Sequence, residues 1–253
     1  MTEMIATRAA YGEALARLGD VNPGVVVLDA DLSASTRTAD FAKRHPERFI
    51  QMGIAEQDMI GTAAGLAASG KVAFASTFAV FASGRAFDQV RNAVCYSRLN
   101  VKICATHAGL TVGEDGASHQ SVEDIALMRA VPNMTVIVPS DAVQTAWAVN
   151  AAAAMDGPVY MRLGRAPVPV IYGEGQEFAI GKAHTMRMGS DVTIIACGIM
   201  VPRALAAAEA LSEEGISARV LDMHTAKPLD VNAVRAAADD TGAIVTAEEH
   251  SII

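Results

Sequence analysis

Short apolar runs along the chain alternate with segments of helical spacing. Val25–Leu28 is a continuous aliphatic run, which is typical of a strand buried on both faces. Residues 4–18 place apolar side chains near helical spacing, and Pro23-Gly24 separates that segment from the strand. The same reading predicts strands at 25–28, 49–52, 72–75, 101–105, 134–138 and 159–162, and helices at 4–18, 37–44, 55–69, 78–97, 122–129 and 141–154.

This alternation predicts an α/β fold with parallel strands and helices on both faces of the sheet. Ligands of such sheets gather at the carboxyl ends of the strands. Three predicted loops meet that condition, at residues 29–35, 53–56 and 106–120. A functional site is therefore expected where these loops meet.

Prolines and glycines crowd residues 164–190, where we expect a linker with one hairpin around Phe178–Met186. A second α/β unit follows, with predicted strands at 192–196, 217–221 and 243–246 and helices at 202–214 and 231–239. We therefore divide the chain into a first domain (1–170), a linker (171–190) and a second domain (191–253). About three strands are few for an independent domain, so we expect the second domain to be truncated.

Composition narrows the class of protein. Hydrophobic residues make up 51% and charged residues 19%, which suits an enzyme with a buried sheet. The formal net charge is -8 without basic runs, which argues against a nucleic-acid partner. Cys95, Cys104 and Cys197 lie in apolar runs without C-x-x-C spacing, which suits a reducing compartment. With no signal peptide and no membrane span, the sequence predicts a cytoplasmic protein.

The common nucleotide, zinc and serine-hydrolase motifs are absent from the sequence. Two other segments carry candidate chemistry. Glu56 stands at the start of a small, apolar helix in Gly53–Gly65, where a helix dipole alone would also favour an acid. The glycine-rich loop Thr106–Gln120 holds two histidines and two acids after a strand, and such loops often carry function.

Taken together and in order, these segments resemble the pyrimidine-binding and C-terminal domains of transketolase over essentially the whole chain. The matching motifs are Gly53-Ile-Ala-Glu56-Gln-Asp-Met, Ser76-Thr-Phe78-Ala-Val-Phe81, Gly113-Glu-Asp115-Gly-Ala-Ser-His119-Gln, Pro132-Asn-Met and Pro139-Ser-Asp141. The resemblance implies a thiamine-diphosphate-binding fold, in which a parallel-sheet pyrimidine domain precedes a partial transketolase C-terminal α/β domain. It also implies a transferase that moves a two-carbon ketol group from a ketose phosphate to an aldose phosphate.

The resemblance assigns the cofactor residues. Glu56 matches the catalytic glutamate that hydrogen-bonds N1′ of the aminopyrimidine, and burial among small apolar residues would help it stay protonated. Phe78 and Phe81, at i and i+3 of a predicted helix, match a wall that stacks on the pyrimidine. Asp31 matches a loop that approaches the cofactor. Gly84 stands where many transketolases have a third aromatic residue, and the register slips by a residue or two before Val101.

The resemblance also assigns the substrate residues. His107, Asp115 and His119 match residues that bind sugar hydroxyls, and His119 also matches one that assists proton transfer. Ser35 matches a loop near the substrate. Arg165 matches an arginine that grips the substrate phosphate through its two-pronged guanidinium, with Arg162 as a plausible substitute.

The diphosphate and Mg²⁺ signature of the family, G-D-G followed by N-N, is missing. Glu114-Asp115-Gly116 resembles its first part superficially, but the sequence contains no Asn-Asn pair. We therefore expect no metal ligand in this chain. A partner subunit would hold Mg²⁺ and the diphosphate, and both subunits would pair into a heterotetramer in which this chain also homodimerises.

Three alternatives stay open. The β subunit of a 2-oxo acid dehydrogenase E1 shares the fold and the glutamate, although the loop after Gly113 favours a polyol substrate. Deoxyxylulose-phosphate synthase has a similar loop, but separation from the first half argues against it. A non-catalytic interaction subunit would not need Glu56, Asp115 and His119. The sequence does not name the sugar.

Overall fold

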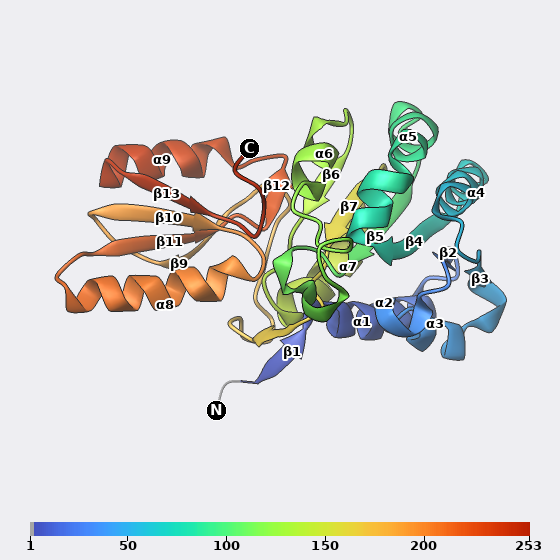
Figure 1. The fold of residues 1–253 in the computed structure, drawn as a ribbon, viewed down its shortest axis with the longest axis horizontal. Coiled ribbons are helices and arrows are strands. Elements are labelled where there is room, and N and C mark those ends of the chain that lie inside the picture. The colour runs from blue at the N-terminus through green and yellow to red at the C-terminus, as the bar shows by residue number, and fades with distance from the viewer. Residues whose placement is uncertain (1–2) are drawn as a thin grey trace.

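A computed structural model describes residues 3–253 and places the strands in three sheets (Figure 1). The largest sheet has seven strands in the order β12-β6-β7-β5-β4-β2-β3, the second has four in the order β13-β10-β11-β9, and β1 pairs with β8. The strands are β1 (Met4–Ala6), β2 (Val25–Asp29), β3 (Phe49–Gln51), β4 (Val72–Phe78), β5 (Val101–Thr106), β6 (Thr135–Ile137), β7 (Val159–Arg162), β8 (Pro167–Pro169), β9 (His184–Arg187), β10 (Val192–Ala196), β11 (Ala218–Asp222), β12 (Thr225–Lys227) and β13 (Ile244–Ala247).

Helices cover both large sheets (Figure 1). The α-helices are α1 (Thr7–Val21), α2 (Ser33–Thr36), α3 (Ala39–Arg44), α4 (Glu56–Ala68), α5 (Phe87–Gln89), α6 (Asp124–Ala130), α7 (Ala142–Ala154), α8 (Met200–Glu213) and α9 (Val231–Thr241). Two short 3₁₀ helices, η1 (Pro46–Arg48) and η4 (Leu110–Asp115), and two π-helical segments, η2 (Phe81–Arg85) and η3 (Val90–Tyr96), complete the set. No helix in the described residues is long and apolar enough to cross a membrane. The α/β class predicted from the sequence is confirmed.

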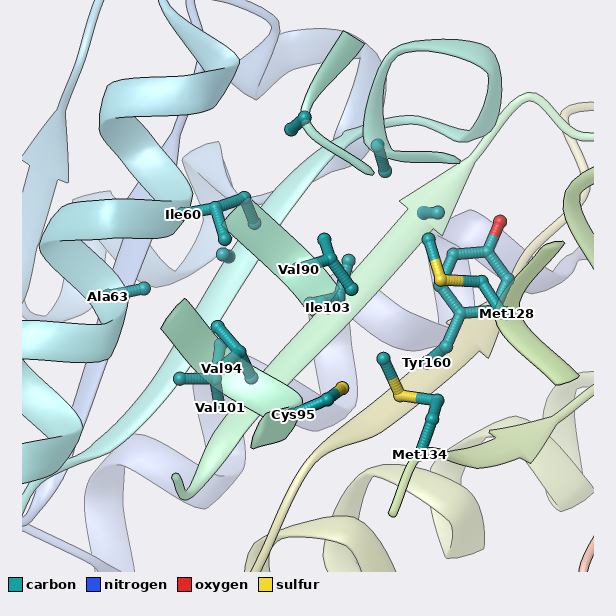
Figure 2. Close-up of a cluster of buried hydrophobic side chains, with 14 of the residues drawn as sticks. Ile60, Ala63, Val90, Val94, Cys95, Val101, Ile103, Met128, Met134 and Tyr160 are labelled. Carbon is teal, nitrogen blue, oxygen red and sulfur yellow. The ribbon is translucent and has the colours of Figure 1, made fainter. Parts of the chain in front are cut away.

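The first sheet is buried on both faces because its side chains alternate between two cores. Val25 and Val27 of β2 pack with α1 and α7, whereas Val26 and Leu28 pack on the opposite face with α4. Figure 2 shows the α4 side of this core, where α4, η3 and β5 contribute Ile60, Val90 and Ile103. This double burial explains the unbroken apolar runs of the sequence.

The helix expected at residues 78–97 begins later and is irregular. Pairing between β4 and β5 continues to Phe78 and Thr106, so Phe78 ends a strand rather than starting a helix. The prediction that Phe78 and Phe81 share a helix face was therefore wrong. The helix that follows contains the π-helical segments η2 and η3, and the Ala86 N–H donates to the Phe81 carbonyl five residues earlier.

The linker also differs from expectation. Within the described residues no hairpin forms at 178–186, because residues 184–187 instead form β9, which runs antiparallel to β11 in the second sheet. That sheet has four strands, and α8 and α9 lie on its opposite faces (Figure 1). Strand β12 was not predicted. It leaves the second domain and pairs antiparallel with β6 at the edge of the first sheet.

A buried polar network joins the two sheets. Asp222, at the end of β11, accepts hydrogen bonds from the Tyr172 hydroxyl (2.6 Å) and the Gln144 amide (2.9 Å). Asp141 caps α7 through the Gln144 N–H (2.8 Å) and accepts the Tyr172 N–H (2.9 Å). Burial raises the pKa of Asp222 to about 6. One carboxyl group thus links the first domain, the linker and the second domain.

Stability should depend on pH through Asp222. An acid whose folded pKa is raised favours the folded state when protonated, so its contribution is lost as pH rises from about 4 to about 6. Relative to an Asp222→Asn variant, the parent should lose on the order of 2 kcal/mol of unfolding free energy over this interval. Urea unfolding at pH 4.5 and pH 7 measures the difference. Asp239→Asn, at an exposed position on α9, is the control, and equal pH dependence of the Asp222 variant and the parent would contradict the assignment.

Candidate active site

The site forms at one edge of the first sheet, where four parallel strands end side by side. β2, β4, β5 and β7 are neighbours in parallel register. Ser35 follows β2, Phe78 ends β4, His107 follows β5 and Arg165 follows β7. The sequence predicts a site at the carboxyl ends of the strands. The structure brings these residues to one edge of the sheet.

Aromatic rings form a continuous wall at this edge. The His107 ring stacks on Phe78 with centroids 3.9 Å apart, and Phe78 stacks on Phe81 at 5.9 Å with an interplanar angle of 10°. His119 meets Phe81 edge-on at 5.5 Å. Phe78 and Phe81 face one another although they come from a strand and a π-helical segment, because the chain turns directly between them.

Glu56 lies next to this wall at the first position of α4. Its side chain is 1% exposed and accepts a hydrogen bond from the Arg85 guanidinium at 2.8 Å. The same guanidinium lies over the Phe81 ring, 4.4 Å from its centroid. A buried acid and an aromatic face are thus bridged by one planar cation.

His107 is held in a defined protonation state. Arg8 can only donate, so its Nη1, 3.4 Å from His107 Nε2, requires that nitrogen to accept. His107 Nδ1 then donates to the Thr106 hydroxyl at 2.8 Å. Burial, and next the charge of Arg8, lower the pKa of His107 to about 4. The imidazole is therefore neutral near pH 7, with a fixed tautomer.

Arg8 and Arg85 are residues of this site that the sequence analysis missed. The Arg8 guanidinium also donates to the Ser35 carbonyl at 2.9 Å. Burial, and next the positive charge of Arg165, lower the pKa of Arg8. Two guanidinium groups close enough for one to lower the pKa of the other form an arrangement that can bind an anion, although Arg165 is paired with Glu114 in this structure. A signal existed, since Arg8 lies in the first turn of α1, where a helix dipole disfavours a cation.

The glycine-rich loop lies beside Arg165. Arg165 donates to the Val112 carbonyl and to Glu114, both at 2.5 Å, and lies 3.9 Å from Asp115. Arg162 instead turns into the protein, where it is 6% exposed and donates to Asp124 at 2.9 Å. Arg165 rather than Arg162 therefore faces the site.

The structure brings together all the expected site residues except one. Asp31 has a left-handed backbone with φ of 64°, and its N–H donates to the Gln51 side chain at 2.7 Å. Its exposed side chain forms no hydrogen bond or ion pair with the other site residues in the described part of the chain. Within residues 3–253, no group of three or more histidine, cysteine and acidic side chains is arranged to hold a metal.

Comparisons with known proteins agree on one family. The transketolase pyrimidine binding domain matches residues 3–170, and the transketolase C-terminal domain matches residues 181–253. A putative transketolase C-terminal section from Methanocaldococcus jannaschii is 54% identical over 248 residues, covering 97% of this chain and 78% of the relative. A 6-deoxy-6-sulfo-D-fructose transketolase subunit from a Clostridium species is 47% identical over 97% of this chain and 76% of its own length.

A solved structure gives the same result. An inactive β4 tetramer of a split-gene transketolase superimposes with a TM-score of 0.93 at 58% identity, covering 99% of this chain and 82% of that one. The fold and the residue order at the sheet edge agree with these matches. The chain belongs to the transketolase family and is a transketolase-type subunit that contains the pyrimidine-binding and C-terminal domains.

Proposed function

We propose that this chain supplies the pyrimidine side of a two-subunit transketolase, which transfers a two-carbon ketol group from a ketose phosphate to an aldose phosphate with thiamine diphosphate. The observation that carries the proposal is the Arg85 guanidinium between Glu56 and Phe81. It is planar, stacks on the ring and donates an N–H to the buried acid. A protonated aminopyrimidine would satisfy the same two groups in the same way, so the residues present fit the cofactor.

When bound, thiamine diphosphate supplies a thiazolium ring that serves as electron sink for cleavage of a carbon–carbon bond. Glu56 would hold a proton at the ring nitrogen that faces it, which requires an acid shielded from water. Phe78 and Phe81 would orient the pyrimidine by stacking. Asp31 would approach the cofactor from the loop after β2.

Neutral His107 has an accepting Nε2 that Arg8 now faces at 3.4 Å, so a sugar hydroxyl would take the place of Arg8 as the donor to this nitrogen. Asp115, His119 and Ser35 would supply further contacts to hydroxyl groups. His119, held edge-on to Phe81, would also move a proton to or from the substrate. Arg165 and Arg8 would bind the substrate phosphate together.

The partner would be a diphosphate-binding transketolase subunit that holds Mg²⁺. Two facts support it: the sequence lacks the Asn-Asn part of the family's metal signature, and a similar split-gene subunit is described as inactive when it forms a tetramer by itself. We propose a heterotetramer in the cytoplasm, with the cofactor between the two kinds of subunit. The names of the relatives favour transketolase over the 2-oxo acid dehydrogenase and deoxyxylulose-phosphate alternatives.

Glu56→Gln should lower turnover by about 100-fold or more, because the amide cannot exchange the proton that activates the cofactor. The assay mixes the chain with its partner, thiamine diphosphate, Mg²⁺, xylulose 5-phosphate and ribose 5-phosphate, and measures sedoheptulose 7-phosphate. Asp58→Asn, at an exposed acid on the same helix, should keep parental activity. Turnover by the Glu56 variant at the parental rate would refute the proposed role.

Arg165→Ala should raise KM for phosphorylated substrates by about tenfold or more, because a charge-assisted hydrogen bond is lost. An unphosphorylated ketose should be turned over with little change, so the comparison separates phosphate binding from a general defect. Arg17→Ala, at an exposed arginine of α1, serves as control. Equal losses on both kinds of substrate would show that Arg165 orders the loop and does not bind phosphate.

Arg85→Met should strengthen cofactor binding to the assembled enzyme by up to about fivefold, because no half-exposed ion pair has to be broken first. A cofactor titration followed by activity measures the change, and Arg91→Met, at an exposed arginine of η3, is the matched control. Weaker binding by the Arg85 variant would mean that Arg85 contacts the cofactor itself.

A further inference from the structure

The segment after β13 leaves the second sheet and lies along the first domain, beside the glycine-rich loop. The Ser251 N–H donates to the Val122 carbonyl at 2.7 Å, and His250 Nε2 accepts the Ala126 N–H at 3.3 Å. Glu249, the residue before them, points toward the glycine-rich loop, and its carboxylate accepts the Thr111 N–H at 2.6 Å. Residues of the second domain therefore contact the chain on both sides of His119.

Glu249 sits where only a glycine leaves room. A Cβ at position 109 would overlap the Glu249 carboxylate, and Gly109 has a left-handed backbone with φ of 80°. The side chain of Glu249 is 7% exposed although it comes from the end of a domain. The Glu249 carboxylate therefore packs directly against the backbone of the glycine-rich loop at Gly109.

Arg162 connects the same acid to the core of the first domain. It donates to the Glu249 carbonyl at 2.9 Å, and its Nη1 lies 3.7 Å from the Glu249 carboxylate. Its Nε donates to Asp124, which also accepts the Tyr160 hydroxyl at 2.8 Å. Glu249 therefore has one fixed partner in the core and one, the Thr111 N–H, in the loop.

The loop segment η4 is consequently held from two sides. Arg165 binds the Val112 carbonyl and Glu114 on the side of the site, and Glu249 binds the Thr111 N–H on the other. Asp115 is the last residue of this segment. If the second contact is removed, Arg165 and the weaker bond from the Gln120 amide to the Leu110 carbonyl (3.3 Å) have to order the segment.

We propose that Glu249 is a positioning residue of the second domain, which fixes the loop Leu110–Asp115 so that Asp115 and Arg165 keep their places at the substrate site. The inference rests on the proposed function for the identity of the substrate. Glu249 is assigned a positioning role because its buried carboxylate is already engaged by the Thr111 N–H and lies against Gly109. This role would give the second domain a function in the reaction, although all the candidate substrate and cofactor residues belong to the first domain.

Steady-state kinetics of the assembled enzyme test the inference. Glu249→Ala should raise KM for the phosphorylated substrates by about tenfold, because a buried hydrogen bond to a charged group is lost from the loop. The affinity for thiamine diphosphate should not change, because Glu56 and Phe81 lie on other elements. Glu249→Gln keeps an oxygen acceptor for the Thr111 N–H and should restore most of the loss. Glu248→Ala removes a neighbouring exposed acid and should behave as the parent.

Hydrogen–deuterium exchange of the full chain gives a readout that needs no activity. Amides of residues 110–115 should exchange about tenfold faster in Glu249→Ala than in Glu248→Ala, because the Thr111 N–H loses its acceptor. Unchanged exchange together with parental KM would overturn the inference. An equal loss of thiamine diphosphate affinity in Glu249→Gln and Glu249→Ala would also overturn it, because it would show a general structural defect. If the parent complex itself shows no transferase activity, the proposed function fails, and the exchange result still decides whether Glu249 orders the loop.

Discussion

The parallel pairing of β2, β4, β5 and β7 determines where every polar group of the site can be. Both faces of this sheet are filled by apolar side chains, so a shift of one strand by one residue would exchange the side chains of the two cores and disrupt the packing of both. Burial therefore stabilises one register, and this register sets the position along the sheet at which each strand ends. Ser35, Phe78 and His107 lie at one edge because the strands that precede them pair in this register.

Much of this could be predicted from the sequence, for a physical reason. Aliphatic runs such as Val25–Leu28 indicate burial directly, and Glu56 and the loop after β5 were identified because their motifs together resemble those of one family. Arg8 and Glu249 were missed because their roles depend on contacts across about a hundred residues or more, which no local pattern records. Phe78 was misplaced because the length of β4 is set by its pairing with β5 and not by its own composition.

The π-helical segments show how local geometry changes what a side chain can do. In η2 the wider turn places Arg85 over Phe81 and within reach of Glu56. A bare carboxylate in that position would be a buried charge without a partner, which is strongly destabilising. The Arg85 guanidinium supplies that partner for the buried Glu56 side chain.

Strand β12 has a consequence for the order in which the protein can be assembled. β6 pairs with β7 on one side, but its other side is completed by Thr225–Lys227, about ninety residues later in the chain. Lys227 also donates to the carbonyls of Arg129 and Val131 beside that edge. During synthesis the edge of β6 stays open for pairing with a foreign strand until most of the second domain has left the ribosome. The first domain therefore cannot complete its sheet before most of the second domain has been synthesised, even though each domain has its own core.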